Sequence, residues 1–524
     1  MKPTGPLARD VADEGVVLQV ALADTPTATP NRVVIYDWFT RVGTPPRPGN
    51  DVEVLVDGEE TWSRVFQDLE LASQSVLAST WLLRADHELV RPEALALAPA
   101  SERAPLRFAE AIERLAEKGV QVRLLIWGAT YTPLINRWLR RWFWGAPFGI
   151  ELLEQDHPRL IGSVHQKTFT IDSRVGYCGG MNIKENDWDT SAHTVYDPRR
   201  NPHSTSPDFR HAVKSKQKRT KYPPRHDLTL RIEGPAVHDL EVNFQQRWNQ
   251  SLRAHRASIF GRLTDLIRNR LLRRPPHTRL REPETSPAEL GNRWIQIIRT
   301  TPGGEEGILD AYRRAIANAR KYIYIENQYF RSPIIGRAIV KALERNPGLR
   351  IAVVAWPIND GKKSWDPSGY WTAHTQNAIR RVAPHFKLTR VMVHDPHTAD
   401  RAERYVQIDV HAKVMIIDDV WLTIGSANIN DRGFKYEAEI NAALLDPADA
   451  RALRLRLMAE HLEIAPEEAE AKLGDIQQAF DLWEQHGNEN ERRKAAGEAP
   501  ISRVVHFLQE APRKPPFGIG QGVF

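Results

Sequence analysis

Val410–Asn428 reads VHAKVMIIDDVWLTIGSAN, and Val164–Asn182 reads VHQKTFTIDSRVGYCGGMN. Both stretches carry His-x-Lys-x-x-x-x-Asp, then six residues, then Gly-x-x-Asn, and the copies lie 246 positions apart (411 − 165). Five residue types at fixed spacing do not recur at one offset by accident, so we interpret the pair as a duplication. A period this long indicates a duplicated domain, because solenoid repeats are far shorter.

The repeat extends upstream of the motif, where Gly58 and Gly304 each begin a Gly-Glu-Glu triplet, again 246 positions apart (304 − 58). Each triplet is followed by helical apolar spacing and then by two β-rich runs. These segments are Ser63–Ser73 and Ile308–Asn318 (helices), and Val76–Leu83, Tyr322–Tyr329, Val120–Trp127 and Leu349–Trp356 (strands). The alternation predicts an α/β protein with two duplicated lobes, each a mixed β-sheet flanked by helices.

A chain of 524 residues is too long for one core, which agrees with two lobes. The predicted division is an N-terminal extension (1–50), a first lobe (51–252), a basic linker (253–290), a second lobe (291–475) and a C-terminal helical and tail segment (476–524). In the linker we expect a helix, Ser258–Leu272, that packs between the lobes. Arg210–Arg225 is expected to be a long loop.

Charge and cysteine content narrow the class of protein. Cys178 is the only cysteine, which excludes an internal disulfide and a cysteine-rich metal site. The net charge of +6 suits an anionic partner such as phospholipid or nucleic acid. No apolar run is long enough to span a bilayer, and acidic residues precede the apolar run Val16–Ala23, which suits a strand and not a signal peptide. We therefore expect a soluble or peripheral membrane protein, either cytoplasmic or exported by a signal-independent route.

The motif places chemistry on an apolar strand. His411 and Lys413 are two residues apart and share one face of that strand, among side chains that suit burial. An imidazole and an ammonium are costly to bury without use. Asp418 is expected to close the following turn, and Ser426 and Asn428 supply hydroxyl and amide donors in a tight bend.

Two copies facing each other across a pseudo-twofold axis would offer two imidazoles, two lysines and two asparagines, a set that matches a phosphodiester. Lysine and amide donors neutralise the non-bridging oxygens, while one histidine attacks phosphorus and the other protonates the leaving oxygen. Because the lysines supply the positive charge, and no convincing cluster of Asp, Glu and His ligands is apparent in the sequence, we expect no metal and no cofactor.

The pair HQKTFTID and HAKVMIID resembles the HKD signature of the phospholipase D superfamily. Over roughly Val52–Ile464, YIYIENQYF (Tyr322–Phe330) and RHDL (Arg225–Leu228) further resemble the phosphatidylcholine-type enzymes, and the short single-motif nucleases of the superfamily lack these features. The resemblance implies a two-lobed fold with the active site at the lobe interface, and it implies roles for individual residues.

The implied catalytic residues are His165 as nucleophile, His411 as general acid, and Lys167, Lys413, Asp172 and Asp418 from the same motifs. The implied substrate-binding residues are Asn182, Asn428, Ser426 and Trp188, and the carboxylates expected to orient the histidines are Asp227 and Glu439. Two positions depart from the pattern: Gly180 stands where the second copy has Ser426, and Asp187 precedes Trp188 where an arginine is common.

The resemblance favours a phospholipase D that hydrolyses the distal phosphodiester of glycerophospholipids to phosphatidic acid and a free head group through a phosphohistidine, with transphosphatidylation also possible. Alternatives are a cardiolipin synthase-type phosphatidyltransferase, a metal-independent nuclease or phosphodiesterase, and an inactive lipid-binding module. The expected partner is phospholipid at a membrane surface, with no nucleic acid, and we expect a monomer. Leu134–Trp144 (LINRWLRRWFW) suits either a lipid interface or packing on the sheet.

Overall fold

The computed structural model describes residues 17–20, 31–34, 38–128, 149–158, 162–202, 204–272, 276–358 and 368–510. The expected helix Leu134–Trp144 and the tail from Ala511 lie outside these residues. The strand expected within Val16–Ala23 is confirmed, since β1 (Val17–Val20) pairs antiparallel with β2 (Asn31–Val34).

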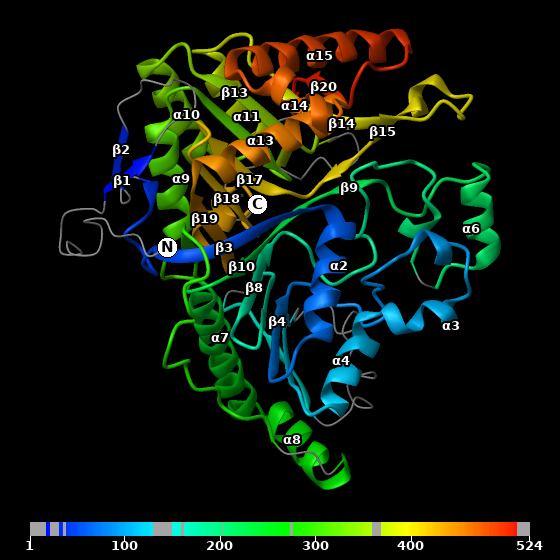
Figure 1. Cartoon of the computed structure of the whole chain (residues 1–524), viewed down its shortest axis with the longest axis vertical. Helices are drawn as coiled ribbons and strands as arrows, with labels where there is room; N and C mark the ends of the chain where they lie inside the picture. The colour runs from blue at the N-terminus through cyan, green and yellow to red at the C-terminus, as the bar shows by residue number, and fades with distance from the viewer. Residues whose placement is uncertain are drawn as a thin grey trace.

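The two lobes share a core order of elements, β-α-β-α followed by six strands and a helix when counted without the inserted elements of each lobe (Figure 1). The first lobe consists mainly of β3 (Arg47–Val56), α2 (Asp57–Glu70), β4 (Ser75–Thr80), α4 (Phe108–Glu117), β5 (Gln121–Trp127), β6 (Ile150–Gln155), β7 (Thr168–Ile171), β8 (Val175–Gly179), α6 (Pro207–Lys214), β9 (Arg225–His226), β10 (Leu228–Glu233) and α7 (Val237–Ala257). The second consists mainly of β11 (Arg293–Thr300), α9 (Gly307–Asn318), β12 (Tyr322–Asn327), α10 (Pro333–Arg345), β13 (Arg350–Ala355), α11 (Ser368–Arg380), β14 (Leu388–His394), β15 (Tyr405–Gln407), β16 (Asp409–Val410), β17 (Lys413–Ile417), β18 (Trp421–Gly425), α12 (Asp431–Lys435), β19 (Glu439–Leu445) and α13 (Pro447–Leu462).

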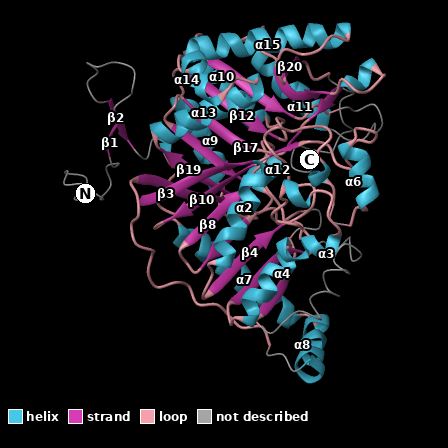
Figure 2. Cartoon of the chain, turned by 45° about the vertical axis from the view of Figure 1, so that its right-hand side comes forward, coloured by secondary structure: helices cyan, strands magenta, loops and turns pink. Residues whose placement is uncertain are grey.

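A single mixed sheet of 16 strands runs through both lobes, in the order β15-β14-β13-β12-β17-β18-β19-β11-β3-β10-β8-β7-β4-β5-β6, with β20 (Val504–Phe507) paired to β14. The lobes join where β3 pairs with β11. Moving outward from this junction on either side, the first four strand pairings are antiparallel and the next two are parallel. Helices cover both faces (Figure 2). The predicted α/β fold with two duplicated lobes is therefore confirmed.

The motif strands form the inner part of each half-sheet. Every residue of β7 and β17 is buried, so both faces of these strands lie in the interior. β17 (KVMII) accordingly reads as a nearly continuous apolar run, whereas β7 (TFTI) alternates threonine with apolar residues. The two lobes also meet across a pseudo-twofold axis, because Cys178 of β8 lies with its sulfur 4.0 Å from the carbonyl of Ile424 on β18. These two residues are equivalent, 246 positions apart (424 − 178), so equivalent strands face each other.

Three regions differ from the expectations. Residues 476–510 belong to the second lobe, since α15 (Ile476–Ala496) packs on β20, which extends the sheet. The expected loop Arg210–Arg225 begins inside α6. The helix in the linker exists as α8 (Ile259–Leu272), but the prediction that it packs between the lobes is wrong. It projects from α7 at the far end of the first lobe, and Ile259, Leu263 and Leu266 are 74%, 51% and 47% exposed (Figures 1 and 2).

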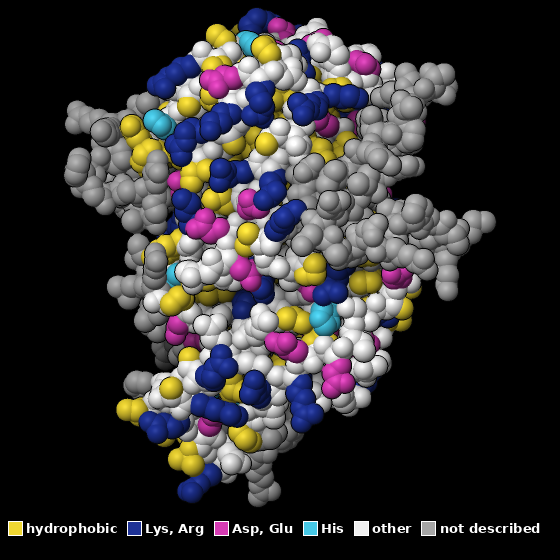
Figure 3. All heavy atoms as spheres, turned by 90° about the vertical axis from the view of Figure 1, so that its left-hand side faces the viewer, with side chains coloured by type: hydrophobic (Ala, Val, Ile, Leu, Met, Phe, Trp, Pro, Cys, Tyr) yellow, Lys and Arg dark blue, Asp and Glu magenta, His cyan; other side chains and the backbone are white. Residues whose placement is uncertain are grey.

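Among the described residues, no helix combines the length and apolar character that a membrane crossing requires. On the face shown in Figure 3, Lys and Arg side chains extend from the second lobe to the tip of the first, with Asp and Glu among them. The excess of positive charge is thus distributed over this face and does not form one uniform patch there.

Candidate active site

Each motif histidine is held by the backbone of the other lobe. His165 stands just before β7 and donates its backbone N–H to the carbonyl of Ala438, at 2.8 Å. His411 stands just before β17 and donates in the same way to the carbonyl of His226, at 2.7 Å. Parallel pairing of Val164 with Ala438 and of Val410 with His226 fixes both contacts. The lobe interface therefore positions both histidines symmetrically.

The residue after each of these carbonyls is a carboxylate that meets the histidine ring. Nδ1 of His165 lies 3.0 and 3.2 Å from the two carboxylate oxygens of Glu439. Nδ1 of His411 lies 2.7 Å from Oδ2 of Asp227. A carboxylate at Nδ1 selects the tautomer with the proton on that nitrogen, so Nε2 of each ring keeps its lone pair.

Burial keeps both rings neutral. Loss of solvent lowers the pKa of His165 well below its ordinary value, and the Lys167 ammonium lowers it further. For His411 burial also lowers the pKa most, followed by the positive charges of Arg225 and Lys413. At neutral pH each ring therefore presents an unprotonated Nε2, the form that a nucleophile or a general base needs.

The two motif lysines are buried beside the histidines. Nζ of Lys167 donates to the carbonyl of His165 at 2.5 Å, and Nζ of Lys413 donates to the carbonyl of His411. Burial lowers the pKa of Lys167 to about 7 and that of Lys413 to about 8. The Lys413 ammonium lowers the pKa of Lys167 further, and the Arg225 guanidinium does the same for Lys413, while Glu439 and Asp227 oppose both shifts. Two buried ammonium groups side by side make a site that an anion would stabilise.

The motif asparagines follow the strands next to the lysine strands. Asn182 comes after β8 and is fully buried, and Asn428 comes after β18 and is 5% exposed. Asp187 holds Asn182, accepting its backbone N–H at 2.7 Å and its side-chain N–H at 3.1 Å. Asp187 also lies 2.7 Å from the Arg225 guanidinium. Asp187 therefore fixes the orientation of the Asn182 amide.

Family models match both halves of the chain. The model described as "Phospholipase D" matches residues 159–275, around the first motif, and the one described as "Cardiolipin synthase, PLD-like domain" matches residues 312–458, around the second. The chain belongs to the phospholipase D superfamily.

Relatives in the superfamily cover most of this chain. Phospholipase D A of Dictyostelium discoideum is 26% identical over 499 residues, which span 81% of this chain and 36% of that protein. Phospholipase D alpha 4 of Arabidopsis thaliana is 25% identical, over 78% of this chain and 63% of that protein. The major cardiolipin synthase ClsA of Bacillus subtilis (strain 168) is 24% identical, over 77% of this chain and 67% of that protein. The chain thus spans less than two thirds of the first two relatives. The solved phosphatidylserine synthase of Haemophilus influenzae Rd KW20 aligns with a TM-score of 0.48 at 14% identity, covering 85% of this chain and 94% of that one.

The two aspartates of the superfamily motif do not join the histidines and lysines. Asp172 follows β7 at the end remote from His165, and its carboxylate accepts the backbone N–H groups of Ser73, Gln74 and Ser75, each at 2.8 Å. Asp418 likewise accepts the backbone N–H groups of residues 320, 321 and 322 at 2.6–2.8 Å. Both have positive φ, 52° and 57°. This corrects their grouping with the catalytic residues: they close a turn and anchor the start of the neighbouring strand.

Two residues expected to bind substrate are also engaged elsewhere. The Ser426 hydroxyl donates to Glu439 at 2.5 Å and accepts the backbone N–H of Ile440 at 3.0 Å, so it positions the carboxylate. Trp188 is 1% exposed in the core of the first lobe, with the guanidinium of Arg91 4.8 Å from its ring centroid. Both corrections have the same cause, since the side chains are fully packed against protein groups.

Aromatic residues that the sequence reasoning missed stand beside His165. The edge of the His165 ring faces Trp81, at 5.9 Å between centroids, and Trp81 stacks on Trp127 at 5.4 Å. They directly follow β4 and end β5, at the carboxyl ends of parallel strands, where α/β sheets bind ligands. Their position at the ends of two predicted strands is the feature of the sequence that could have identified them as site residues.

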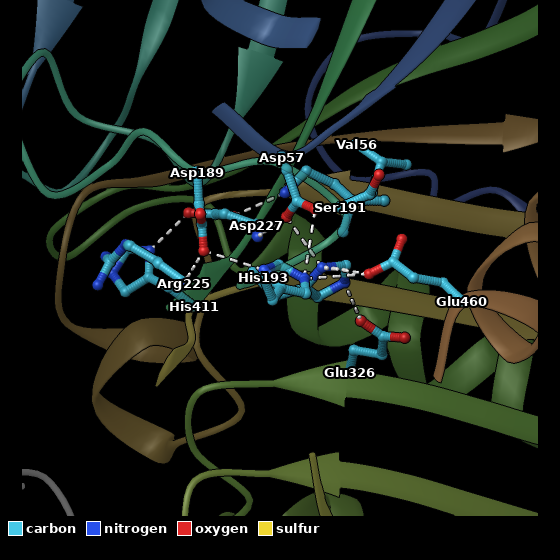
Figure 4. A network of polar contacts seen from close by, with 12 residues as sticks. Val56, Asp57, Asp189, Ser191, His193, Arg225, Asp227, Glu326, His411 and Glu460 are labelled. Atoms are coloured by element: carbon cyan, nitrogen blue, oxygen red, sulfur yellow. Dashed lines mark hydrogen bonds and ion pairs between the residues drawn. The ribbon is translucent and has the colours of Figure 1, made fainter. Parts of the chain in front are cut away.

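A second group was also missed. The expectation that no cluster of Asp, Glu and His ligands exists is wrong: Asp57, His193, His226 and Glu460 come together in the interior, and His226 also meets Glu326 and His461. Figure 4 shows this network continuing from His411 and Asp227. Its members come from distant segments of both lobes, so no local spacing could reveal it.

Proposed function

We propose that the protein is a phosphatidyl-type phospholipase D, which cleaves the distal phosphodiester of a glycerophospholipid to phosphatidic acid and a free head group. The observation that carries the proposal is the pair of neutral imidazoles, each oriented by a carboxylate of the other lobe, beside two buried lysines. The superfamily relationship supports a phosphodiesterase-type enzyme.

In the first step of the proposed reaction, Nε2 of His165 attacks phosphorus, and the bond from phosphorus to the head-group oxygen breaks. His411 supplies the proton to that oxygen. An incoming phosphodiester anion raises the pKa of the buried groups that face it, which allows His411 to be charged at this stage. Lys167, Lys413 and the asparagine amides stabilise the negative charge on the non-bridging oxygens. His165 serves as nucleophile by family resemblance, since the two rings are held in nearly the same way.

In the second step, Nε2 of His411 takes a proton from water, the water oxygen attacks phosphorus, and the bond from phosphorus to His165 breaks. Phosphatidic acid leaves, and the free enzyme is restored. An alcohol in place of water yields transfer of the phosphatidyl group through the same steps.

A cardiolipin synthase-type transfer is the second candidate. The match of residues 312–458 to a cardiolipin synthase domain and the Bacillus subtilis relative favour it. The two reactions share the covalent intermediate and differ only in the acceptor, water in one and the hydroxyl of a second phospholipid in the other.

Mass spectrometry of lipid products tests the proposal. The protein is incubated with vesicles of phosphatidylcholine, phosphatidylethanolamine and phosphatidylglycerol, with His165→Asn as the inactive control. Phosphatidic acid plus free head group is the expected result, and cardiolipin from phosphatidylglycerol would assign the transfer reaction instead. Cleavage of DNA with no change in any lipid would contradict both and indicate a nuclease.

A further inference from the structure

Four acid and imidazole side chains converge behind Asp227. Nε2 of His193 lies 3.4 Å from Oδ2 of Asp57 and 3.1 Å from Oε1 of Glu460. Nδ1 of His226 lies 2.9 Å from Oδ1 of Asp57 and 3.4 Å from Oε1 of Glu460. The histidines are fully buried, Asp57 is 1% exposed, and the Glu460 side chain is 9% exposed.

These separations are compatible with a metal site. Metal–ligand bonds of about 2.0–2.1 Å at tetrahedral angles place neighbouring ligand atoms roughly 3.3–3.4 Å apart. The four separations here are 2.9–3.4 Å, with His193 facing Oδ2 and His226 facing Oδ1 of Asp57, and one donor atom from each of the four residues lies within 4.8 Å of the others. Two imidazole nitrogens and two carboxylate oxygens form a ligand set that zinc and neighbouring divalent transition metals accept.

Among the residues that the structure describes, two of the atoms that face this centre have no hydrogen bond of acceptable geometry. They are Nδ1 of His226 and Oδ2 of Asp57, both buried, although Nδ1 lies 2.9 Å from Oδ1 of Asp57 and Oδ2 lies 3.4 Å from Nε2 of His193. Buried polar atoms are nearly always satisfied, so such a pair at one point requires an explanation. A cation between the four side chains would satisfy both.

The outer nitrogens of both histidines meet carboxylates. Nδ1 of His193 lies 3.0 Å from Asp189, and Nε2 of His226 lies 2.8 Å from Glu326. Metal-bound histidines characteristically carry a carboxylate on the nitrogen that does not bind the metal, because it fixes the ring and increases its basicity. Both rings have this arrangement, and Figure 4 labels His193 and Asp189 for the first of them.

We propose that Asp57, His193, His226 and Glu460 form a closed, four-coordinate site for a divalent transition-metal ion, with zinc as the first candidate, that fastens the two lobes behind the active site. Three ligands belong to the first lobe, and Glu460 lies on α13 of the second. With four protein ligands the site leaves no position for substrate, which makes its role structural.

The site supports the catalytic carboxylate directly. The backbone N–H of Asp57 donates to the carbonyl of Asp227 at 2.8 Å, and Oδ1 of Asp57 accepts the N–H of Asp227 at 3.2 Å. His226 is the neighbour of Asp227 in the chain. Fixing Asp57 and His226 therefore fixes the group that orients His411. The other group, His226, Glu326 and His461, is a weaker candidate because Tyr324, His226 and His461 already occupy both oxygens of Glu326.

Metal analysis tests the site without an activity assay. The untagged protein is produced with added zinc, purified without chelator and measured by inductively coupled plasma mass spectrometry. We expect about one ion per chain. His193→Gln and Glu460→Gln should remove it, while exposed controls of the same types, His211→Gln and Glu467→Gln, should keep it.

Since the ligand variants could fail to fold, a second measurement uses the unaltered chain. After removal of the ion by dipicolinate, Co²⁺ is added and visible absorption is recorded. Strong d–d bands of four-coordinate cobalt, together with a rise in Tm on adding Zn²⁺, support the site. A chain that binds no ion, shows weak six-coordinate cobalt bands and keeps its Tm would overturn it, and so would an ion retained by folded His193→Gln and Glu460→Gln.

Discussion

The two halves of the active site carry the same motif but hold their carboxylates differently. Glu439 meets His165 and is itself held by the Ser426 hydroxyl. Asp227, shorter by one methylene, meets His411 and accepts the backbone N–H of Leu228 at 2.9 Å. One carboxylate is therefore positioned by a side chain, and the other by the backbone.

The departure at Gly180 follows from this difference. Gly180 is the counterpart of Ser426, and a Cβ there would lie 2.2 Å from Oδ1 of Asp227. The space that the serine fills in one half is filled by the carboxylate in the other. The sequence alone suggested a missing hydroxyl donor, whereas the structure shows two matched pairs, serine with glutamate and glycine with aspartate. A repeat can thus keep its chemistry while exchanging the residues that support it.

The largest loss of activity should come from changing the motif histidines, which both halves of the site contain. His165→Asn and His411→Asn should each lower kcat by at least about 10⁴-fold, because each removes a group that acts on the reacting bonds. The double variant should be little worse than either single one, since residues that act as a unit are not additive. Steady-state kinetics on phosphatidylcholine vesicles measures this, and near-additive losses would contradict a shared mechanism.

Removal of a lysine should have the next largest effect. Lys167→Ala or Lys413→Ala should lower kcat/KM about 10²–10³-fold by removing one donor to the charged oxygens. Lys341→Ala, at an exposed position of α10, serves as the matched control and should change nothing. A lysine variant of the site with nearly full activity would show that the two halves do not share the phosphate.

Exchanging the supporting residues tests the comparison itself. Gly180→Ser should displace Asp227, because its side chain would clash with the carboxylate. Ser426→Ala removes one hydrogen bond to the Glu439 carboxylate and should lower kcat about 10-fold or somewhat more. The decrease in kcat should therefore be larger for Gly180→Ser. Measurement of kcat and Tm for both variants tests whether serine with glutamate and glycine with aspartate are matched pairs. Equal and small effects would mean that the pairs are not matched.

The smallest effect should appear in the pH profile. The lysine ammonium groups bind the anion, and their pKa values are lowered to about 7 and about 8, so kcat/KM should fall as the pH rises through this range and the ammoniums lose their protons. On the acid side it should fall only well below pH 6.5, where His165 becomes protonated and loses its lone pair. A profile that rises steadily to pH 10 would contradict the charged role of the lysines.

Much of this architecture could be predicted from the sequence, because the repeated motifs and the strands are each short, continuous segments of the chain. Fixed spacing around His165 and His411 revealed the repeat, and apolar runs revealed strands such as β5 and β13. The exposed face of α8 could not be predicted, since amphipathic spacing shows that a face is apolar but not what covers it. The cluster around His226 was invisible for another reason: four separate segments contribute to it, and only the closed fold brings them together.

The central claim is that one histidine forms a covalent bond to phosphorus while the other transfers protons, and a burst experiment tests it most directly. His411→Asn is mixed with a p-nitrophenyl phosphodiester, whose leaving group departs without a proton. We predict a burst of about one nitrophenol per site, followed by a stall, because the base for hydrolysis is missing. Intact-protein mass should rise, with the added mass on a peptide that contains His165. His165→Asn should give neither burst nor adduct. An adduct on His411 would reverse the two roles, and the absence of any burst or adduct in either variant would contradict the covalent mechanism and favour direct attack by water.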